Sequence, residues 1–165
     1  MIQKKICMLG GFSVGKTSLV KRFVTGQFSD KYHTTIGVKI DQKSLSVDDT
    51  ELLLVLWDIY GEDDFQKVRA SYLQGSAGYL LVIDGTRKET LEVARQLHAV
   101  AMQAMGPVPY ALVINKHDLY ESWQVTPEMY EDLASNACLV IRSSAKTGKS
   151  VESAFTELAE QLLKV

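Results

Sequence analysis

The sequence predicts an α/β fold in which helices cover both faces of a mostly parallel sheet. Apolar, strand-like runs alternate along the chain with segments of helical periodicity, which is the pattern of strand–helix–strand units. The chain has 165 residues, 46% of them hydrophobic, and this suits a single compact domain over residues 1–165. Ligands of such folds bind at the carboxyl ends of the strands. The residues that follow each strand are therefore the first candidates for a functional site.

The first third of the chain predicts a strand, a helix and a hairpin. Residues 2–9 form an apolar run typical of a buried strand, and residues 16–25 carry apolar side chains at helical spacing. Residues 26–37 follow neither periodicity and are polar, so we expect a long surface connection. The runs 38–47 and 51–57 flank an Asp-Asp-Thr turn, which predicts an antiparallel hairpin.

The rest of the chain continues the alternation of helices and strands. We expect, in order, a short helix over 65–73, a strand over 78–84, a helix over 89–105, a strand over 110–115, a helix to about residue 135, a strand over 138–142 and a helix over 150–164. Thr126 and Pro127 suit the start of the fourth helix, with a hydroxyl cap and a proline in the first turn.

The charge balance argues against two classes of partner. The chain has 18 basic and 20 acidic residues and a net charge of -2. It therefore offers no basic field for nucleic acid and no polybasic tail for anionic membranes. Cys7 and Cys138 both lie in apolar runs, so we expect buried thiols in a reducing compartment.

The two ends of the sequence predict a cytoplasmic protein. The apolar run near Met1 is too short for a signal peptide. The last residues, Glu-Gln-Leu-Leu-Lys-Val, carry no cysteine for prenylation. We therefore expect neither export nor a membrane anchor in this chain.

A phosphate-binding motif follows the first predicted strand. Residues 10–17 read Gly-Gly-Phe-Ser-Val-Gly-Lys-Thr, which matches G-x-x-x-x-G-K-[ST] and opens a helix. Glycines let backbone N–H groups approach a phosphate chain closely, and the helix presents its positive end. Lys16 is placed to reach the outer phosphates, and the Thr17 hydroxyl is placed to ligate magnesium. The motif predicts a site for a nucleotide and Mg²⁺.

Two later motifs predict which nucleotide binds. Asp58 ends a buried strand, where its carboxylate can hold a magnesium-bound water, and the N–H of Gly61 can face a terminal phosphate. Asn115-Lys116-His117-Asp118 ends another strand. The carboxylate of Asp118 offers two acceptors for the N1–H and N2–H donors of guanine. Adenine lacks this donor pair, so a site of this kind would reject it.

The neighbours of Asp118 have supporting roles in this interpretation. Lys116 would lie along the plane of the purine, and Asn115 would tie its loop to residues 10–17. Ser143-Ser144-Ala145-Lys146 follows the last strand, and the N–H of Ala145 can face the guanine O6.

Together these motifs and their spacing resemble the Ras-like small GTPases over essentially the whole chain, and the Trp57-Asp58 pair and residues 26–37 look most like the Rab branch. The resemblance implies a three-layer P-loop G domain with a six-stranded, mostly parallel sheet, one antiparallel strand and five helices. It implies a monomeric molecular switch that binds GTP or GDP with Mg²⁺ and hydrolyses GTP to GDP and phosphate.

The resemblance also implies roles for individual residues. Phe28 would stack on guanine, and Thr35 would bind magnesium and the terminal phosphate of GTP. Residues 30–38 and 58–75 would be two switches that contact effectors and exchange and activating proteins. The residues expected to bind nucleotide are Gly11, Phe12, Ser13, Val14, Gly15, Lys16, Thr17, Ser18, Phe28, Thr35, Gly61, Asn115, Lys116, Asp118, Ser144, Ala145 and Lys146. Those expected to bind the metal are Thr17, Thr35 and Asp58, and those expected to act in catalysis are Lys16, Thr35, Gly61 and Glu62.

Three residues depart from the family pattern. Glu62 replaces the glutamine that orients the attacking water, Tyr60 replaces an alanine, and Phe12 replaces a small residue. A carboxylate cannot donate a hydrogen bond, and its charge is repelled by the phosphates, so we expect slow hydrolysis. Two alternatives stay open: Glu62 acts as an efficient base, or the protein is a GTP-stabilised interaction module with little hydrolysis or switching. The Phe12 ring either obstructs an incoming arginine finger or folds away over the switches.

Two other features are interpreted as structural. Residues 148–150 read Gly-Lys-Ser, but Ser143 stands where a second phosphate loop needs glycine, so we expect a turn and a helix cap. The histidines lack the spacing of metal ligands, so surface or packing roles are expected for His33, His98 and His117.

Overall fold

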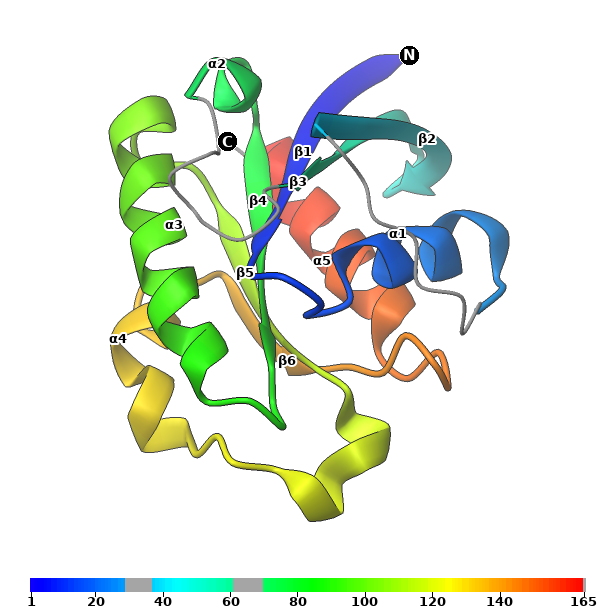
Figure 1. Ribbon diagram of the computed structural model, residues 1–165. Helices are drawn as coiled ribbons and strands as arrows, with labels where there is room; N and C mark the ends of the chain where they lie inside the picture. Colours follow the sequence, from blue (N-terminus) through cyan, green and yellow to red (C-terminus); the bar gives the residue numbers. More distant parts are fainter. Residues whose placement is uncertain (29–36, 61–69, 165) are drawn as a thin grey trace.

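A six-stranded sheet with the order β2-β3-β1-β4-β5-β6 runs through the molecule (Figure 1). The computed structural model describes residues 1–28, 37–60 and 70–164. The strands are β1 (Ile2–Gly10), β2 (Gly37–Val47), β3 (Thr50–Tyr60), β4 (Gly78–Asp84), β5 (Tyr110–Asn115) and β6 (Leu139–Arg142). Only the β2–β3 pair is antiparallel among the paired strands of these ranges. The predicted mostly parallel sheet with one antiparallel strand is confirmed.

Helices cover both faces of the sheet, with α1 and α5 on one side and α3 on the other (Figure 1). The α-helices are α1 (Lys16–Thr25), α2 (Ala70–Leu73), α3 (Glu89–Met105), α4 (Glu131–Ala134) and α5 (Val151–Lys164), and the 3₁₀ helices include η2 (His117–Ser122) and η3 (Pro127–Tyr130). Within residues 1–28, 37–60 and 70–164, these five α-helices agree with the number that the family resemblance implies. Within the described ranges, no helix combines the length and the apolar character that a membrane crossing requires.

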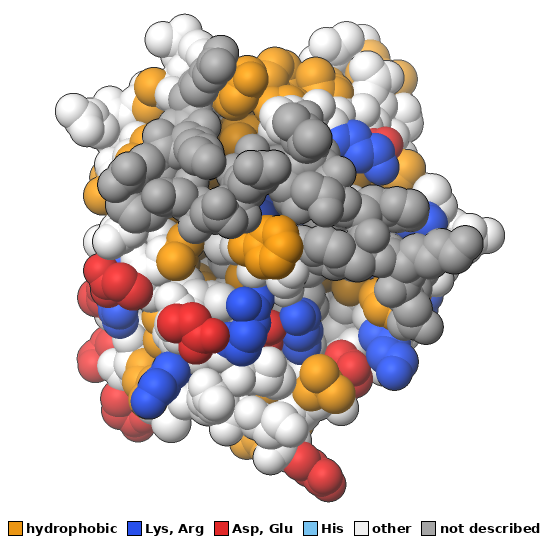
Figure 2. Space-filling view, in the orientation of Figure 1, with side chains coloured by type: hydrophobic (Ala, Val, Ile, Leu, Met, Phe, Trp, Pro, Cys, Tyr) orange, Lys and Arg blue, Asp and Glu red, His pale blue; other side chains and the backbone are white. Residues whose placement is uncertain are grey.

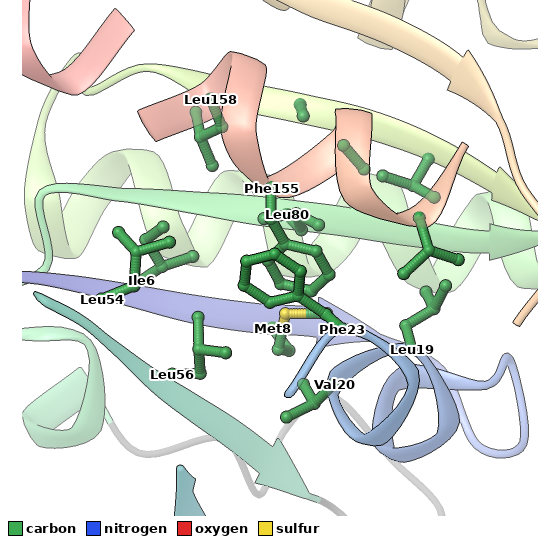
Figure 3. Close-up of a cluster of buried hydrophobic side chains, with 14 of the residues drawn as sticks. Ile6, Met8, Leu19, Val20, Phe23, Leu54, Leu56, Leu80, Phe155 and Leu158 are labelled. Atoms are coloured by element: carbon green, nitrogen blue, oxygen red, sulfur yellow. The ribbon is translucent and has the colours of Figure 1, made fainter. Parts of the chain in front are cut away.

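Aromatic stacking fixes α1 against α5 and the sheet. The rings of Phe23 and Phe155 are parallel, with centroids 4.2 Å apart, and both side chains are buried among residues of β1, β3 and β4 (Figure 3). Truncating such a ring to alanine typically costs about 3–5 kcal/mol of stability. The start of α1, which carries Lys16 and Thr17, is therefore held firmly relative to the sheet.

The opposite face of the sheet has a polar contact within its core. Tyr79 and Tyr110 stack with ring centroids 5.1 Å apart, and the hydroxyl of Tyr79 lies 2.8 Å from Nδ1 of His98. Burial lowers the pKa of His98 below its ordinary value and so favours the neutral ring. These contacts agree with the expected packing role of His98.

Three local expectations are wrong. The segment that starts at Thr126 is not one helix, because the backbone of Tyr130 leaves the helical region (φ −117°, ψ 16°) between η3 and α4. Thr126 makes no side-chain capping hydrogen bond, although Pro127 does occupy the first turn. Cys138 precedes β6 and is exposed, whereas Cys7 in β1 is buried as expected. Of the helix expected over 65–73, residues 65–69 lie outside the described residues.

Candidate functional site

The loop between β1 and α1 is closely packed and requires its glycines. Gly15 has a positive φ of 103°, and a Cβ there would lie 2.3 Å from Nδ2 of Asn115. A Cβ on Gly10 would lie 2.5 Å from the carbonyl oxygen of Val82 in β4. Real side chains do not tolerate such distances, so glycine is needed at both positions for steric reasons.

Lys16 is the first residue of α1, and its ammonium group folds back over the loop. Nζ donates to the carbonyl oxygens of Gly10 at 2.9 Å and Gly11 at 3.3 Å, and the residue is only 6% exposed. Burial lowers the pKa of Lys16, and the nearby charge of Asp58 partly opposes this. A buried ammonium group of this kind is stabilised most by an anionic partner, such as a phosphate, because burial has removed its hydration.

Thr17 and Asp58 form a pair that suits a hard cation. Oγ1 of Thr17 donates to Oδ2 of Asp58 at 2.5 Å, and Asp58 is 1% exposed. Its second oxygen, Oδ1, is the one buried side-chain nitrogen or oxygen atom among the described residues that has no hydrogen-bond partner. Burial raises the pKa of Asp58, against the opposing effects of Lys16 and Thr17.

This donor set fits Mg²⁺ better than it fits a transition metal. Magnesium binds one or two protein oxygens and completes its shell with waters and phosphates. The orphaned Oδ1 of Asp58 and the hydroxyl of Thr17 are oxygens of this kind. No cluster of three or more His, Cys, Asp or Glu residues that could hold a metal occurs in the described ranges. Thr35, the third expected ligand, lies outside them.

Asn115 joins the end of β5 to two other loops. Its Nδ2 donates to the carbonyl oxygen of Val14 at 2.9 Å, across 101 positions of sequence. Its Oδ1 accepts hydrogen bonds from the hydroxyl of Ser143 at 3.1 Å and from the N–H of Ala145 at 3.3 Å. The N–H expected to face guanine O6 is therefore directed at Asn115 in this structure.

Lys116 and Asp118 are both oriented by neighbouring polar groups. Nζ of Lys116 donates to the carbonyl oxygen of Ser13 at 2.8 Å. Oδ1 of Asp118 accepts a hydrogen bond of 2.7 Å from the hydroxyl of Ser144, which itself accepts the N–H of Thr147 at 3.1 Å. Asp118 is exposed. Its carboxylate is thus fixed in direction and accessible to a ligand.

Asp84 is a site residue that the sequence motifs do not reveal. It ends β4 opposite Asn115 in the sheet register, and its side chain is fully buried. Oδ1 accepts the N–H and the hydroxyl of Thr86, while Oδ2 accepts Nε of Arg87 and contacts Nζ of Lys116, both at 2.9 Å.

These contacts keep Asp84 ionised. Burial alone would raise the pKa of Asp84, but the hydrogen bonds from Lys116, Thr86 and Arg87 outweigh it and lower the pKa. In the sequence, the only sign that Asp84 belongs to the candidate site is that it is a carboxylate at the end of an otherwise apolar strand. Figure 2 shows basic side chains near the middle of one face.

The structure brings most, but not all, of the expected residues to one edge of the sheet. Phe28 is partly buried against the α1–α5 side of the core, Phe12 is 45% exposed, and Lys146 is exposed. Thr35, Gly61 and Glu62 lie outside the described residues, and the side chain of Tyr60 is not described. Residues 148–150 form a turn before α5, with a positive φ of 86° at Gly148.

Comparison with known proteins identifies the family. A family model described as the Ras family matches residues 5–164. Proteins named Ras-related protein Rab-1, from Theileria parva and Theileria annulata, are each 34% identical over 161 residues, which cover 96% of this chain and 73% of the relative. The match to the family model begins within β1 and extends through α5, so it includes every loop of the site described above. The chain therefore belongs to the Ras family and is a Rab-like small GTPase.

Proposed function

We propose that this GTP-binding protein is a molecular switch that binds GTP or GDP with Mg²⁺ and hydrolyses GTP slowly. The observation that best supports the proposal is the set of contacts by which Asn115 and Lys116 hold the loop before α1. These contacts join residues 10–17, which would bind phosphates, to residues 115–118, which would bind the base. One ligand that carries both a phosphate chain and a purine can therefore span the two segments.

The chain offers a partner for each end of a guanine nucleotide. Lys16 would exchange its contacts with the Gly10 and Gly11 carbonyls for the outer phosphates. Asp118, held by Ser144, would accept the N1–H and N2–H of guanine. Ser144, Ala145, Lys146 and Phe28 would surround the base. An adenine in this position would not offer the Asp118 carboxylate the N1–H and N2–H donors, and the loss of such a pair typically gives about 10⁴-fold discrimination.

Thr17 and Asp58 would hold Mg²⁺, together with Thr35, as the resemblance implies. The bound ion would neutralise charge on the phosphates. The chain's own contribution is the prepared pair of Thr17 and Asp58, held in contact by a hydrogen bond. The burial that raises the pKa of Asp58 also means that this carboxylate gains from an adjacent cation.

Slow hydrolysis is proposed from three side chains. Glu62 would place a negative charge beside the terminal phosphate and could accept from the attacking water without donating. Tyr60 adds bulk at the same loop. The Phe12 ring, which is 45% exposed at the phosphate loop, would obstruct an incoming arginine. Thr35 and Gly61 would contact the terminal phosphate, as the resemblance implies.

Replacing Glu62 with glutamine is expected to raise the rate of GTP hydrolysis. The amide restores a group that can both donate and accept, and it removes a negative charge that the phosphates repel. Single-turnover hydrolysis of preloaded GTP with Mg²⁺ measures the effect directly. A rate that is unchanged or lower in the Glu62→Gln variant would contradict slow hydrolysis through Glu62, and a lower rate would favour Glu62 as a working base.

A second candidate function is a GTP-stabilised interaction module that switches little. The switch proposal assigns contacts with effectors and with exchange and activating proteins to residues 30–38 and 58–75. Amide hydrogen exchange of these segments should therefore differ between GDP and a non-hydrolysable GTP analogue, because the terminal phosphate orders a switch. Residues 151–164 serve as an internal reference. Equal protection of the two segments with both nucleotides would favour the module.

A further inference from the structure

Arg87, in the loop that follows β4, contacts the phosphate loop from outside. We infer that Arg87, anchored by Asp84, is a positioning residue that holds the phosphate-binding loop of residues 10–17 (the P-loop) at Phe12 and thereby slows the release of bound nucleotide. The inference rests on the proposed binding of guanine nucleotides at residues 10–17. It adds a contact that the family motifs do not contain.

Three consecutive carbonyl groups of the P-loop are held by three different side chains. The carbonyl oxygen of Phe12 accepts Nη2 of Arg87 at 2.7 Å. The next carbonyl, of Ser13, accepts Nζ of Lys116 at 2.8 Å, and that of Val14 accepts Nδ2 of Asn115 at 2.9 Å. Lys116 and Asn115 belong to the motif of residues 115–118 that is expected to bind guanine, whereas Arg87 comes from the separate loop after β4.

The direction of these carbonyls sets the direction of the amides between them. In a planar trans peptide the C=O and N–H bonds point in opposite directions. Each hydrogen bond that draws a carbonyl outward therefore turns the N–H of the same peptide away from the donor. The affected amides are those of Ser13, Val14 and Gly15, which lie where a phosphate loop presents N–H groups to its ligand.

Ser13 shows why the contact from Arg87 matters. Its φ is 60°, a left-handed conformation that is uncommon for residues other than glycine. Such conformations persist when the surroundings over-determine them. Arg87 holds the peptide before Ser13, and Lys116 holds the peptide after it. Without Arg87, the preceding peptide would lose this hydrogen bond and would be held less firmly in its orientation.

Asp84 makes Arg87 a rigid clamp. One oxygen of this buried carboxylate accepts Nε of Arg87 and contacts Nζ of Lys116, each at 2.9 Å. Arg87 therefore binds at two points, with Nε on Asp84 and Nη2 on Phe12, and the planar guanidinium fixes the distance between them. A lysine keeps the charge but cannot reproduce this fork. The side chain of Arg87 is 34% exposed, so we expect a moderate effect.

The test compares Arg87→Ala and Arg87→Lys with Lys88→Ala. Lys88 is the exposed neighbour of Arg87, and among the described residues its side chain has no hydrogen bond or ion pair. Removing it makes the same change in net charge without touching the P-loop. Displacement of a fluorescent GDP from the Mg²⁺-loaded protein gives the dissociation rate, and phosphorus NMR of bound GDP reports the environment of the phosphates.

We expect GDP to dissociate about tenfold faster from Arg87→Ala, about threefold faster from Arg87→Lys, and at the wild-type rate from Lys88→Ala. The phosphate resonances should shift in the Arg87→Ala variant but not in the Lys88→Ala variant, a result that a general loss of stability would not produce. If Arg87→Ala fails to fold, Arg87→Lys gives the deciding measurement.

Two results would overturn different conclusions. Dissociation rates within twofold of wild type for both Arg87 variants, with unshifted phosphate resonances, would overturn the role of Arg87. Failure of the wild-type protein to bind GDP or GTP at all would instead overturn the proposed function.

Discussion

Replacing Asp118 with asparagine is expected to lower the affinity for GDP and GTP by about a thousandfold. The carboxylate would accept two hydrogen bonds from guanine, and hydrogen bonds to charged groups contribute about 1.5–3 kcal/mol each. Asparagine has the same shape and can still accept from Ser144, but it presents an NH₂ group to one of the guanine donors. Equilibrium titration with fluorescent GDP, GTP and ATP measures both affinity and specificity.

Glu121→Gln is the matched control for this change. Glu121 is an exposed carboxylate in η2, three positions after Asp118, so its amide variant makes the same change in net charge at the same end of the molecule. Its affinity for GDP should equal that of the wild type. Wild-type preference for guanine in the Asp118→Asn variant would show that another group reads the base.

Replacing Gly15 with alanine is expected to weaken nucleotide binding by about a hundredfold or more, since two costs both distort the loop that would bind the phosphates. A left-handed φ costs about 1–2 kcal/mol for a residue with a Cβ. The new methyl group would also lie 2.3 Å from Nδ2 of Asn115, which would have to leave the carbonyl of Val14. A buried group left unpaired costs about 1–3 kcal/mol more. Calorimetric titration with GDP measures the loss.

Gly26→Ala separates the two costs. Gly26 also has a positive φ, of 76°, but a Cβ there would meet nothing within 4 Å. This variant pays the backbone strain at the end of α1 without displacing Asn115. It should unfold at a lower temperature than the wild type and bind GDP with wild-type affinity. Equal losses of affinity in the two variants would mean that general destabilisation, not the contact with Asn115, is responsible.

Contiguous motifs predicted most of the residues that the structure brings together in the candidate site. Residues 10–17 place the glycines, Lys16 and Thr17 within one turn, and that local spacing carries its own chemistry. Asp118 is similarly identified within four consecutive residues. The apolar periodicities gave the order of strands and helices because each period follows from local backbone geometry.

Local patterns failed where tertiary packing decided the outcome. The run after Thr126 has good helix-start residues, yet the backbone at buried Tyr130 breaks it into η3 and α4. Cys138 follows an apolar pattern but lies just before the strand and is exposed. The burial of a side chain depends on neighbours that are distant in sequence, which a local pattern does not contain.

The sequence by itself predicted a site for a phosphate chain beside a carboxylate that would read guanine, and it identified Glu62 as a departure from the family pattern at the residue expected to act in hydrolysis. Those predictions depend on residue types at short spacing. Only the tertiary structure decided that Asp84 and Arg87 lie against residues 10–17 and Lys116. Nothing in Asp-Gly-Thr-Arg is distinctive, and its position matters only because β4 lies between β1 and β5 in the sheet. That order brings the three loops together, so that one buried carboxylate can orient two cations against the P-loop.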